Sequence, residues 1–185
     1  TEIIRNAFIS IAQDMNATLI RSAYTPVIYE GKDCVVALLD EKGEVLGQSS
    51  GLPLFLGNLQ VCVQETARIY GWDYFKAGDI FFVNDSFFTG THLNDITIFA
   101  PIFWNKQLAG FSASRAHWLD VGAKDPGGSM DSSNIYQEGF RWPVTRLYEN
   151  NKPKKEIIEF LRMNGRFGYS LIGDMNAQIA AGKTG

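Results

Sequence analysis

The fold of this chain is decided by residues 92–120, which read HLNDITIFAPIFWNKQLAGFSASRAHWLD. Apolar and β-branched side chains predict one strand over residues 96–103 and a second over residues 108–114. Asn105 and Lys106 lie between them and are expected to form the tight turn of an antiparallel hairpin. The short pattern His-x-x-Asp occurs at both open ends of this hairpin.

Strand pairing is expected to bring the two His-x-x-Asp segments together. With that turn, Asp95 lies opposite Ala116, and Asn94 lies opposite His117. Directly opposed residues have Cβ atoms roughly 4.5–5.5 Å apart, so Asp95 and His117 become close neighbours. A register error of one or two residues would keep them close but could change the face that each occupies. His92 lies in the loop that enters the first strand and can fold back to the same point.

Two imidazoles and one carboxylate suit a divalent transition metal such as Zn, Mn or Fe. We therefore expect His92, Asp95 and His117 to be metal ligands. Three protein ligands would leave positions open for water or substrate, which is typical of a catalytic site. Asp120 could serve as a fourth ligand, or it could orient His117 through a hydrogen bond.

Two other interpretations of the histidines stay open. A histidine near the end of a strand is often only a hydrogen-bonded structural residue. A serine nucleophile paired with a histidine is the weaker alternative, because the chain has no G-x-S-x-G and neither Ser112 nor Ser114 has a special context.

The rest of the chain predicts helices and strands in no regular alternation. Apolar side chains at helical spacing predict a helix over residues 3–20, and others are expected further on. The expected helices beyond it are 59–70, 154–163 and a shorter one over 171–181, and the further strands are 33–39, 45–48 and 79–83. This order predicts an α+β fold with a mixed or mainly antiparallel sheet and flanking helices.

Composition excludes several classes of protein. Hydrophobic residues make up 45% of the chain and aromatic residues 13%, which excludes a disordered chain. The net charge of -3 argues against nucleic acid as the main partner. No apolar run reaches the roughly 18 residues of a membrane span, and no signal peptide is apparent. Cys34 and Cys62 are expected to be free and buried, which favours a reducing cytoplasm.

The same segments resemble the hydantoinase-B/oxoprolinase family. The resemblance is carried by GDIFFVND at 78–85, GTHLND at 90–95, RAHWLDVG at 115–122 and IYQEG at 135–139. The opening helix and the first hairpin resemble the family's N-terminal region too, so the resemblance runs over essentially the whole chain. It implies that residues 1–185 are a single N-terminal portion of a longer B-type subunit.

The resemblance also implies an ATP-dependent assembly. In this family, a hydantoinase-A-like subunit or domain binds ATP and activates a substrate carbonyl by phosphorylation. The B-type subunit then supplies a metal centre, whose ligands correspond to His92, Asp95 and His117. The substrate is a small cyclic amide in the hydrolases or a ketone in the related carboxylases. The segment around His117 favours cyclic-amide hydrolysis, with ketone carboxylation and a non-catalytic assembly module as alternatives.

Four further residues receive expectations. Asp120 is expected to position His117 or accept a proton, although a merely solvated carboxylate is an equal alternative. Glu138 is a candidate ligand or acid/base, with a structural salt bridge as the alternative. Arg115 is expected to pair with a nearby Asp, or to hold a phosphate or carboxylate. Many family members carry a second histidine where this chain has Trp118, which leaves one fewer candidate ligand.

Overall fold

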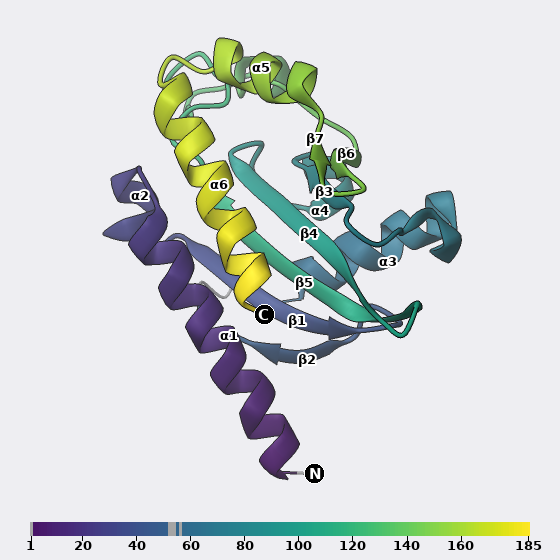
Figure 1. Cartoon of the computed structure of the whole chain (residues 1–185). Coiled ribbons are helices and arrows are strands. Elements are labelled where there is room, and N and C mark those ends of the chain that lie inside the picture. Colours follow the sequence, from purple (N-terminus) through teal and green to yellow (C-terminus); the bar gives the residue numbers. More distant parts are fainter. Residues whose placement is uncertain (1, 52–54, 56) are drawn as a thin grey trace.

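An antiparallel sheet forms the centre of the molecule (Figure 1). The structure is a computed structural model that describes residues 2–51, 55 and 57–185. Within this part the sheet has seven strands in the order β2-β1-β5-β4-β3-β6-β7, and each pair is antiparallel. The strands are β1 (Cys34–Asp40), β2 (Val45–Gln48), β3 (Ile80–Val83), β4 (Asp95–Trp104), β5 (Gln107–His117), β6 (Thr145–Glu149) and β7 (Lys152–Pro153).

Helices cover both faces of this sheet. Figure 1 shows α1 and α6 side by side across one face, α3 behind the other, and α5 beyond the end of β4. The helices are α1 (Glu2–Ser22), α2 (Pro26–Tyr29), α3 (Asn58–Tyr70), α4 (Ser86–Thr89), α5 (Lys155–Asn164) and α6 (Gly168–Thr184), with 3-10 turns η2 (Trp72–Tyr74) and η3 (Ile135–Gln137). The predicted α+β class is confirmed.

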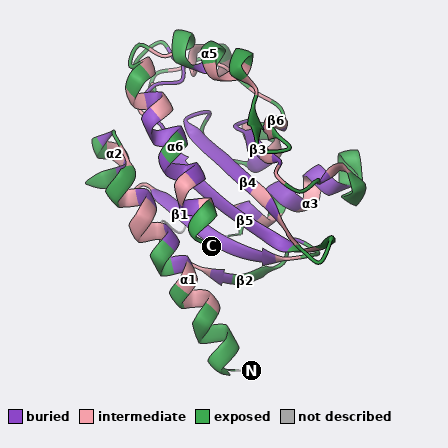
Figure 2. Ribbon diagram, viewed as in Figure 1, coloured by how far each residue is buried: buried purple, intermediate pink, exposed green. Residues whose placement is uncertain are grey.

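The alternation of side chains along β1 separates two hydrophobic cores. Val36 and Leu38 belong to the core under α1 and α6, whereas Val35, Ala37 and Leu39 belong to the core under α3. Successive side chains in a strand point to opposite faces, so a strand covered on both sides must be apolar throughout. Figure 2 shows this as strands buried along most of their length, flanked by helices that bury only one side.

The central hairpin has the predicted turn but a different register. Asn105 and Lys106 both have positive φ, as the turn requires. The pairing shifts between Ile102 and Phe103, so that Asp95 lies opposite His117. The predicted pairing of Asp95 with Ala116 is therefore wrong by one residue.

A bulge on β5 causes this shift. Gly110 pairs with Ile102, and Leu108 pairs with Phe103, which leaves Ala109 as the extra residue. A bulge moves every residue beyond it by one position, so the side chains of Asp95 and His117 share one face of the sheet.

Several other elements differ from their predictions. α6 begins at Gly168 and extends to Thr184, so it is longer than α5 rather than shorter. The short strands β6 and β7, which were not predicted, are joined by Asn150 and Asn151 at positive φ. Residues 51–58 are rich in Gly, Pro and Leu, a composition that predicts a loop. Residues 52–54 and 56 of this stretch lie outside the described part.

The expectation of free, buried cysteines is confirmed for Cys34 and Cys62. Burial raises the pKa of the Cys34 thiol to about 12, and the charge of Asp33 adds to this shift. The thiol is therefore protonated at neutral pH, which removes Cys34 as a nucleophile. Among the described residues, every helix is too short or too polar to cross a membrane.

Candidate metal centre

Three acidic or imidazole side chains lie in one row across three neighbouring strands. Asp95 on β4 pairs with His117 on β5, and the backbone N–H of His117 donates to the carbonyl of Asp33 at 3.0 Å. Asp33 immediately precedes β1, in which Cys34 pairs with Ala116. Because the three residues lie side by side, their side chains emerge on the α3 face at one end of the sheet.

Asp95 connects the two histidines. Its Oδ1 lies 2.8 Å from Nδ1 of His117, and its Oδ2 lies 3.4 Å from Nδ1 of His92. Oδ2 also accepts a hydrogen bond from the backbone N–H of His92 at 3.0 Å, which folds the entering loop back as predicted. Asp95 is fully buried, His117 is 12% exposed at its side chain, and His92 is 65% exposed. The cluster therefore has a buried base and one open side.

The donor set of His92, Asp95 and His117 fits a divalent metal. One ligand atom from each residue lies within 4.8 Å of the other two. Two ligands at roughly 2.0–2.2 Å from a shared ion are separated by about 3 Å, which matches the separations around Asp95. Two neutral imidazoles and one carboxylate are suitable donors for Zn, Mn or Fe.

The surroundings of His117 favour positive charge. Burial lowers the pKa of His117, but a hydrogen bond to Asp95, the charges of Asp95 and Asp33, and the Gly127 backbone together raise it above its usual value. Burial also raises the pKa of Asp33, and the Asp95 charge adds to this, whereas the two histidines lower it. The site thus has an excess of negative charge that a proton or a metal cation could neutralise.

A cavity of about 310 Å³ opens directly onto the histidines. Its lining residues come from the two His-x-x-Asp segments and from the loop after β5. They are His92, Asn94, His117, Gly127, Gly128, Ser129, Met130, Ser132 and Glu138. The buried Ser132 hydroxyl has no hydrogen-bond partner in the described part of the chain, which leaves it available to a ligand.

The two predicted catalytic carboxylates have different positions. Glu138 lines the cavity together with both histidines. Asp120 instead accepts hydrogen bonds from the Arg166 side chain at 3.0 Å and from the backbone N–H groups of Arg166 and Gly122 at 2.5 and 3.0 Å. The structure therefore places Glu138 in the cavity that both histidines line, whereas Asp120 contacts the segment before α6.

Trp118 belongs to the core on the opposite face. Its ring is fully buried and its Nε1 donates to Oε1 of Gln178 on α6 at 2.8 Å. Its backbone N–H donates to the carbonyl of Asn94 at 2.8 Å, and the Asn94 side chain donates to the Trp118 carbonyl at 2.7 Å. Trp118 thus supports the two loops that carry His92 and His117 without facing the cavity.

Arg115 corrects one prediction. The side chain is fully buried, and no Asp or Glu of the described residues pairs with it. Its guanidinium donates to the hydroxyls of Thr97 at 2.8 Å and Thr91 at 3.2 Å and to the Cys62 sulfur at 3.3 Å. The expected pairing with a nearby Asp is wrong. Arg115 instead connects β4, which carries Asp95, with the residue before His92 and with helix α3.

Asp33 is the site residue that the sequence reasoning missed. It appears in the sequence only as the first polar residue before an apolar strand. Its place beside His117 depends on the pairing of β1 with β5, which are separated in the sequence by residues 41–106. The sequence signal that could have identified Asp33 is a carboxylate directly before a fully apolar strand.

Comparison with known proteins links this chain to one family. The sequence model described as Hydantoinase B/oxoprolinase matches residues 1–185. An uncharacterised protein of Methanocaldococcus jannaschii is 37% identical over 97% of this chain and 32% of its own length. Caprolactamase subunit beta of Pseudomonas jessenii is 29% identical over 99% of this chain and 32% of its own length.

A solved structure agrees with these sequence matches. The crystal structure of the ATP-dependent caprolactamase from Pseudomonas jessenii superposes with a TM-score of 0.86 at 27% identity. The match covers 98% of this chain and 31% of that chain. The chain therefore spans about a third of the length of these relatives.

Proposed function

We propose, since this chain belongs to the Hydantoinase B/oxoprolinase family, that it carries the metal centre of an ATP-dependent cyclic-amide hydrolase. The chain would be part of a B-type subunit. The proposal is supported by relatives named caprolactamase subunit beta and 5-oxoprolinase. It is supported also by the structural match to an ATP-dependent caprolactamase.

The observation that carries the proposal is the His92–Asp95–His117 cluster at the base of a cavity. A buried carboxylate that contacts two imidazoles is a costly arrangement unless a cation compensates it. A divalent ion bound there would act as a Lewis acid toward an amide carbonyl and would promote attack by water.

The protein's own residues orient this site. Asp95 directs one oxygen to the ring of His117 and the other to the backbone N–H and ring of His92, which orients both residues toward the cavity. Glu138 lines the cavity, and its carboxylate makes no hydrogen bond or ion pair within the described residues. Glu138 is thus free to accept a proton from water or from the substrate N–H, the acid/base role that we assign to it. The contacts of Asp120 support a structural role instead.

We assign ATP binding to a partner subunit or domain and not to this chain. A cyclic amide is a poor electrophile, and in an ATP-dependent enzyme phosphorylation of its carbonyl oxygen would supply the driving force. We assign this step to a hydantoinase-A-like subunit or domain that binds ATP. The printed name of one relative, caprolactamase subunit beta, is consistent with such an assembly.

The test is ATP-driven ring opening in the assembled enzyme. The protein would be combined with its ATP-binding partner, and turnover of lactams and hydantoins would be measured for the wild type, His117→Ala and Asp95→Asn. We expect kcat/KM to fall more than about a hundredfold in both variants, beyond the 10–100-fold typical of residues that only support a ligand. The exposed Asp73→Asn, at the far end of the sheet, is the matched control and should retain full activity.

Two results would redirect the proposal. Full activity in His117→Ala would indicate a non-catalytic assembly module. A requirement for bicarbonate together with a ketone, and no turnover of cyclic amides, would indicate a carboxylase.

A further inference from the structure

One wall of the cavity beside the histidines is formed by the loop after β5, and this loop is held on both sides of the segment that lines the cavity. The backbone N–H of Gly127 donates to the carbonyl of Leu119 at 2.6 Å. Further along, the backbone N–H of Ser133 donates to Oε1 of Gln137 at 2.8 Å. Most of residues 128–132 line the cavity, and they lie between these two anchors. The segment therefore presents a defined surface to a ligand.

Three polar side chains that line the cavity carry a group without a partner in the described part of the chain. The buried hydroxyl of Ser132 has none, and no hydrogen bond or ion pair reaches the carboxylate of Glu138. Asn94 donates through Nδ2 to the Trp118 carbonyl, which leaves its Oδ1 as an open acceptor. A hydroxyl can donate, whereas an amide oxygen and a carboxylate only accept. The cavity thus suits a ligand that offers two N–H groups and an additional carbonyl.

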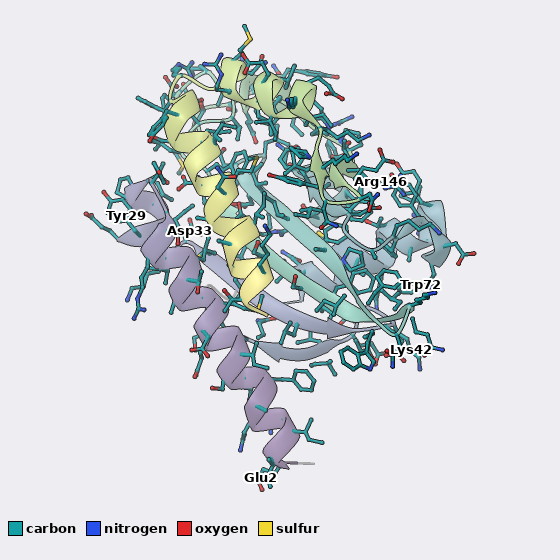
Figure 3. The ribbon with its side chains drawn as sticks, viewed as in Figure 1. Glu2, Tyr29, Asp33, Lys42, Trp72 and Arg146 are labelled. Carbon is teal, nitrogen blue, oxygen red and sulfur yellow. The ribbon has the colours of Figure 1, made fainter. Side chains whose placement is uncertain are left out.

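The same wall lacks positive charge. No Lys or Arg is among the described residues that line the cavity. Figure 3 shows Lys42 and Arg146 far from Asp33, which lies beside the histidines at the cavity's end of the sheet. A negatively charged group on a ligand would therefore meet the carboxylate of Glu138 without a lining cation to offset the repulsion.

We infer that the cavity selects a small neutral ring that contains two amide groups, as in the cyclic urea-amide ring of hydantoin. The reacting amide faces the histidines, with its N–H toward Glu138. The second amide donates its N–H to Oδ1 of Asn94 and accepts at its carbonyl from the hydroxyl of Ser132. Ser132 and Asn94 are thus residues that determine specificity. The inference rests on the proposed function, because it names the substrate class of the same site.

Two other classes of cyclic amide fit this wall less well. A hydrocarbon lactam has one amide, so its binding would cover Ser132 and Asn94 without giving either a partner. A site built to hydrogen-bond a substrate group discriminates strongly against an analogue that lacks the group. A lactam with a carboxylate brings a second negative charge to the cavity that Glu138 lines. The volume of about 310 Å³ is at the small end of the roughly 300–1,000 Å³ of ligand sites, which favours a small ring.

The experiment compares three five-membered rings on the enzyme assembled with its ATP-binding partner. Hydantoin has two amides, 2-pyrrolidinone has one, and 5-oxoproline adds a carboxylate to the 2-pyrrolidinone ring. Turnover is measured with ATP, and ligand-observed NMR measures binding without ATP. We expect kcat/KM for hydantoin to exceed that for either other ring by about a hundredfold, since two hydrogen bonds contribute roughly tenfold each. Affinities without ATP should follow the same order.

Ser132→Ala tests the assigned residue. We expect it to lower both kcat/KM and the affinity for hydantoin about tenfold and to leave 2-pyrrolidinone unchanged, because only hydantoin uses the hydroxyl. A merely structural role would lower the values for both rings equally. Ser132→Thr retains a hydroxyl and should recover part of the loss. Ser133→Ala is the matched control, because Ser133 is exposed and is not among the lining residues.

The outcomes separate this inference from the proposed function. If the assembled enzyme opens none of the three rings, both fail. If it opens 2-pyrrolidinone or 5-oxoproline as well as it opens hydantoin, only the assigned substrate class is wrong. If hydantoin is preferred but Ser132→Ala affects hydantoin and 2-pyrrolidinone equally, the assignment of Ser132 is wrong. The comparison of rings on the wild type needs no variant, so it decides the substrate class even if Ser132→Ala does not fold.

Discussion

The buried carboxylate of Asp95 contacts both His92 and His117 and thereby sets their positions. Its oxygens contact His117 on the neighbouring strand and both the ring and the backbone of His92. A buried charge with this many partners holds its neighbours in defined rotamers before any ligand binds. The same contacts make His117 a titrating group whose protonation is linked to stability.

The metal-free protein should lose stability as the pH rises above about 6.5, the ordinary pKa of histidine. The raised pKa of His117 means that the folded state holds its proton more tightly than the unfolded state. This contribution is fully present below the unfolded pKa and is lost as the pH rises through the folded pKa. Urea unfolding with a chelator at a series of pH values would measure it.

Asp95→Asn is the control for this pH dependence, because it removes the charge that raises the pKa of His117. The slope of unfolding free energy against pH above 6.5 should then be smaller than in the wild type. Equal slopes in the two proteins would contradict the assigned coupling.

A second buried carboxylate, Asp174 on α6, anchors the end of α1. It accepts hydrogen bonds from the backbone of Tyr24 at 2.7 Å and of Thr25 at 3.2 Å, and from the Thr25 hydroxyl at 2.6 Å. Asp174→Ala leaves buried donors without acceptors and should cost about 3 kcal/mol in the free energy of unfolding. Asp174→Asn keeps an acceptor and should cost less. Urea denaturation tests the order, and an alanine variant as stable as the asparagine variant would contradict it.

At the scale of elements, the β4–β5 bulge decides whether the site forms. The sequence predicts both strands and their turn, because these depend on local patterns. The alternation of apolar and polar residues along β5 does not show where the bulge lies. Gly110 is a weak signal, because a glycine inside a strand often marks a bulge. The one-residue shift places Asp95 directly opposite His117, so that the two side chains share a face instead of lying on opposite faces of the sheet.

Gly110 is also where β1 and β5 approach closely. A Cβ at this position would lie 2.3 Å from the backbone carbonyl oxygen of Leu39, and backbone atoms cannot move aside easily. Gly110→Ala should therefore destabilise the protein by about 1–3 kcal/mol, the range for overpacking a core. The exposed neighbour Ala109→Ser serves as the control and should be within about 0.5 kcal/mol of wild type. Equal stability of both variants would contradict the close packing.

At the scale of the whole molecule, the candidate metal centre lies on the α3 face of the sheet, where β1, β4 and β5 end side by side. His92, Asp95 and His117 could be predicted because one hairpin contains them all. Asp33 could not, because it comes from β1 and depends on a pairing between distant segments. The hydrogen bond from Arg166 to Asp120 could not be predicted either, because no local pattern shows that the segment before α6 lies beside Asp120.

Binding at this position should stabilise the fold, because a metal that binds only the folded chain shifts the equilibrium toward the folded state. A metal at a hundred times its Kd adds about 2.7 kcal/mol to the unfolding free energy. For a chain of this size, that corresponds to a rise in Tm of about 5–10 °C. Thermal unfolding with and without Mn²⁺ would measure the rise, and the His92→Ala/His117→Ala double variant should lack it. A rise of the same size in the double variant would place the metal elsewhere.

The most direct test of the account is the metal content of the purified protein. Elemental analysis would compare the wild type with the His92→Ala/His117→Ala double variant, each after reconstitution with Zn²⁺, Mn²⁺ or Fe²⁺ and removal of excess ion. We expect about one equivalent of one of these metals in the wild type and none in the variant. No bound metal in the wild type, or the same amount in both proteins, would contradict it.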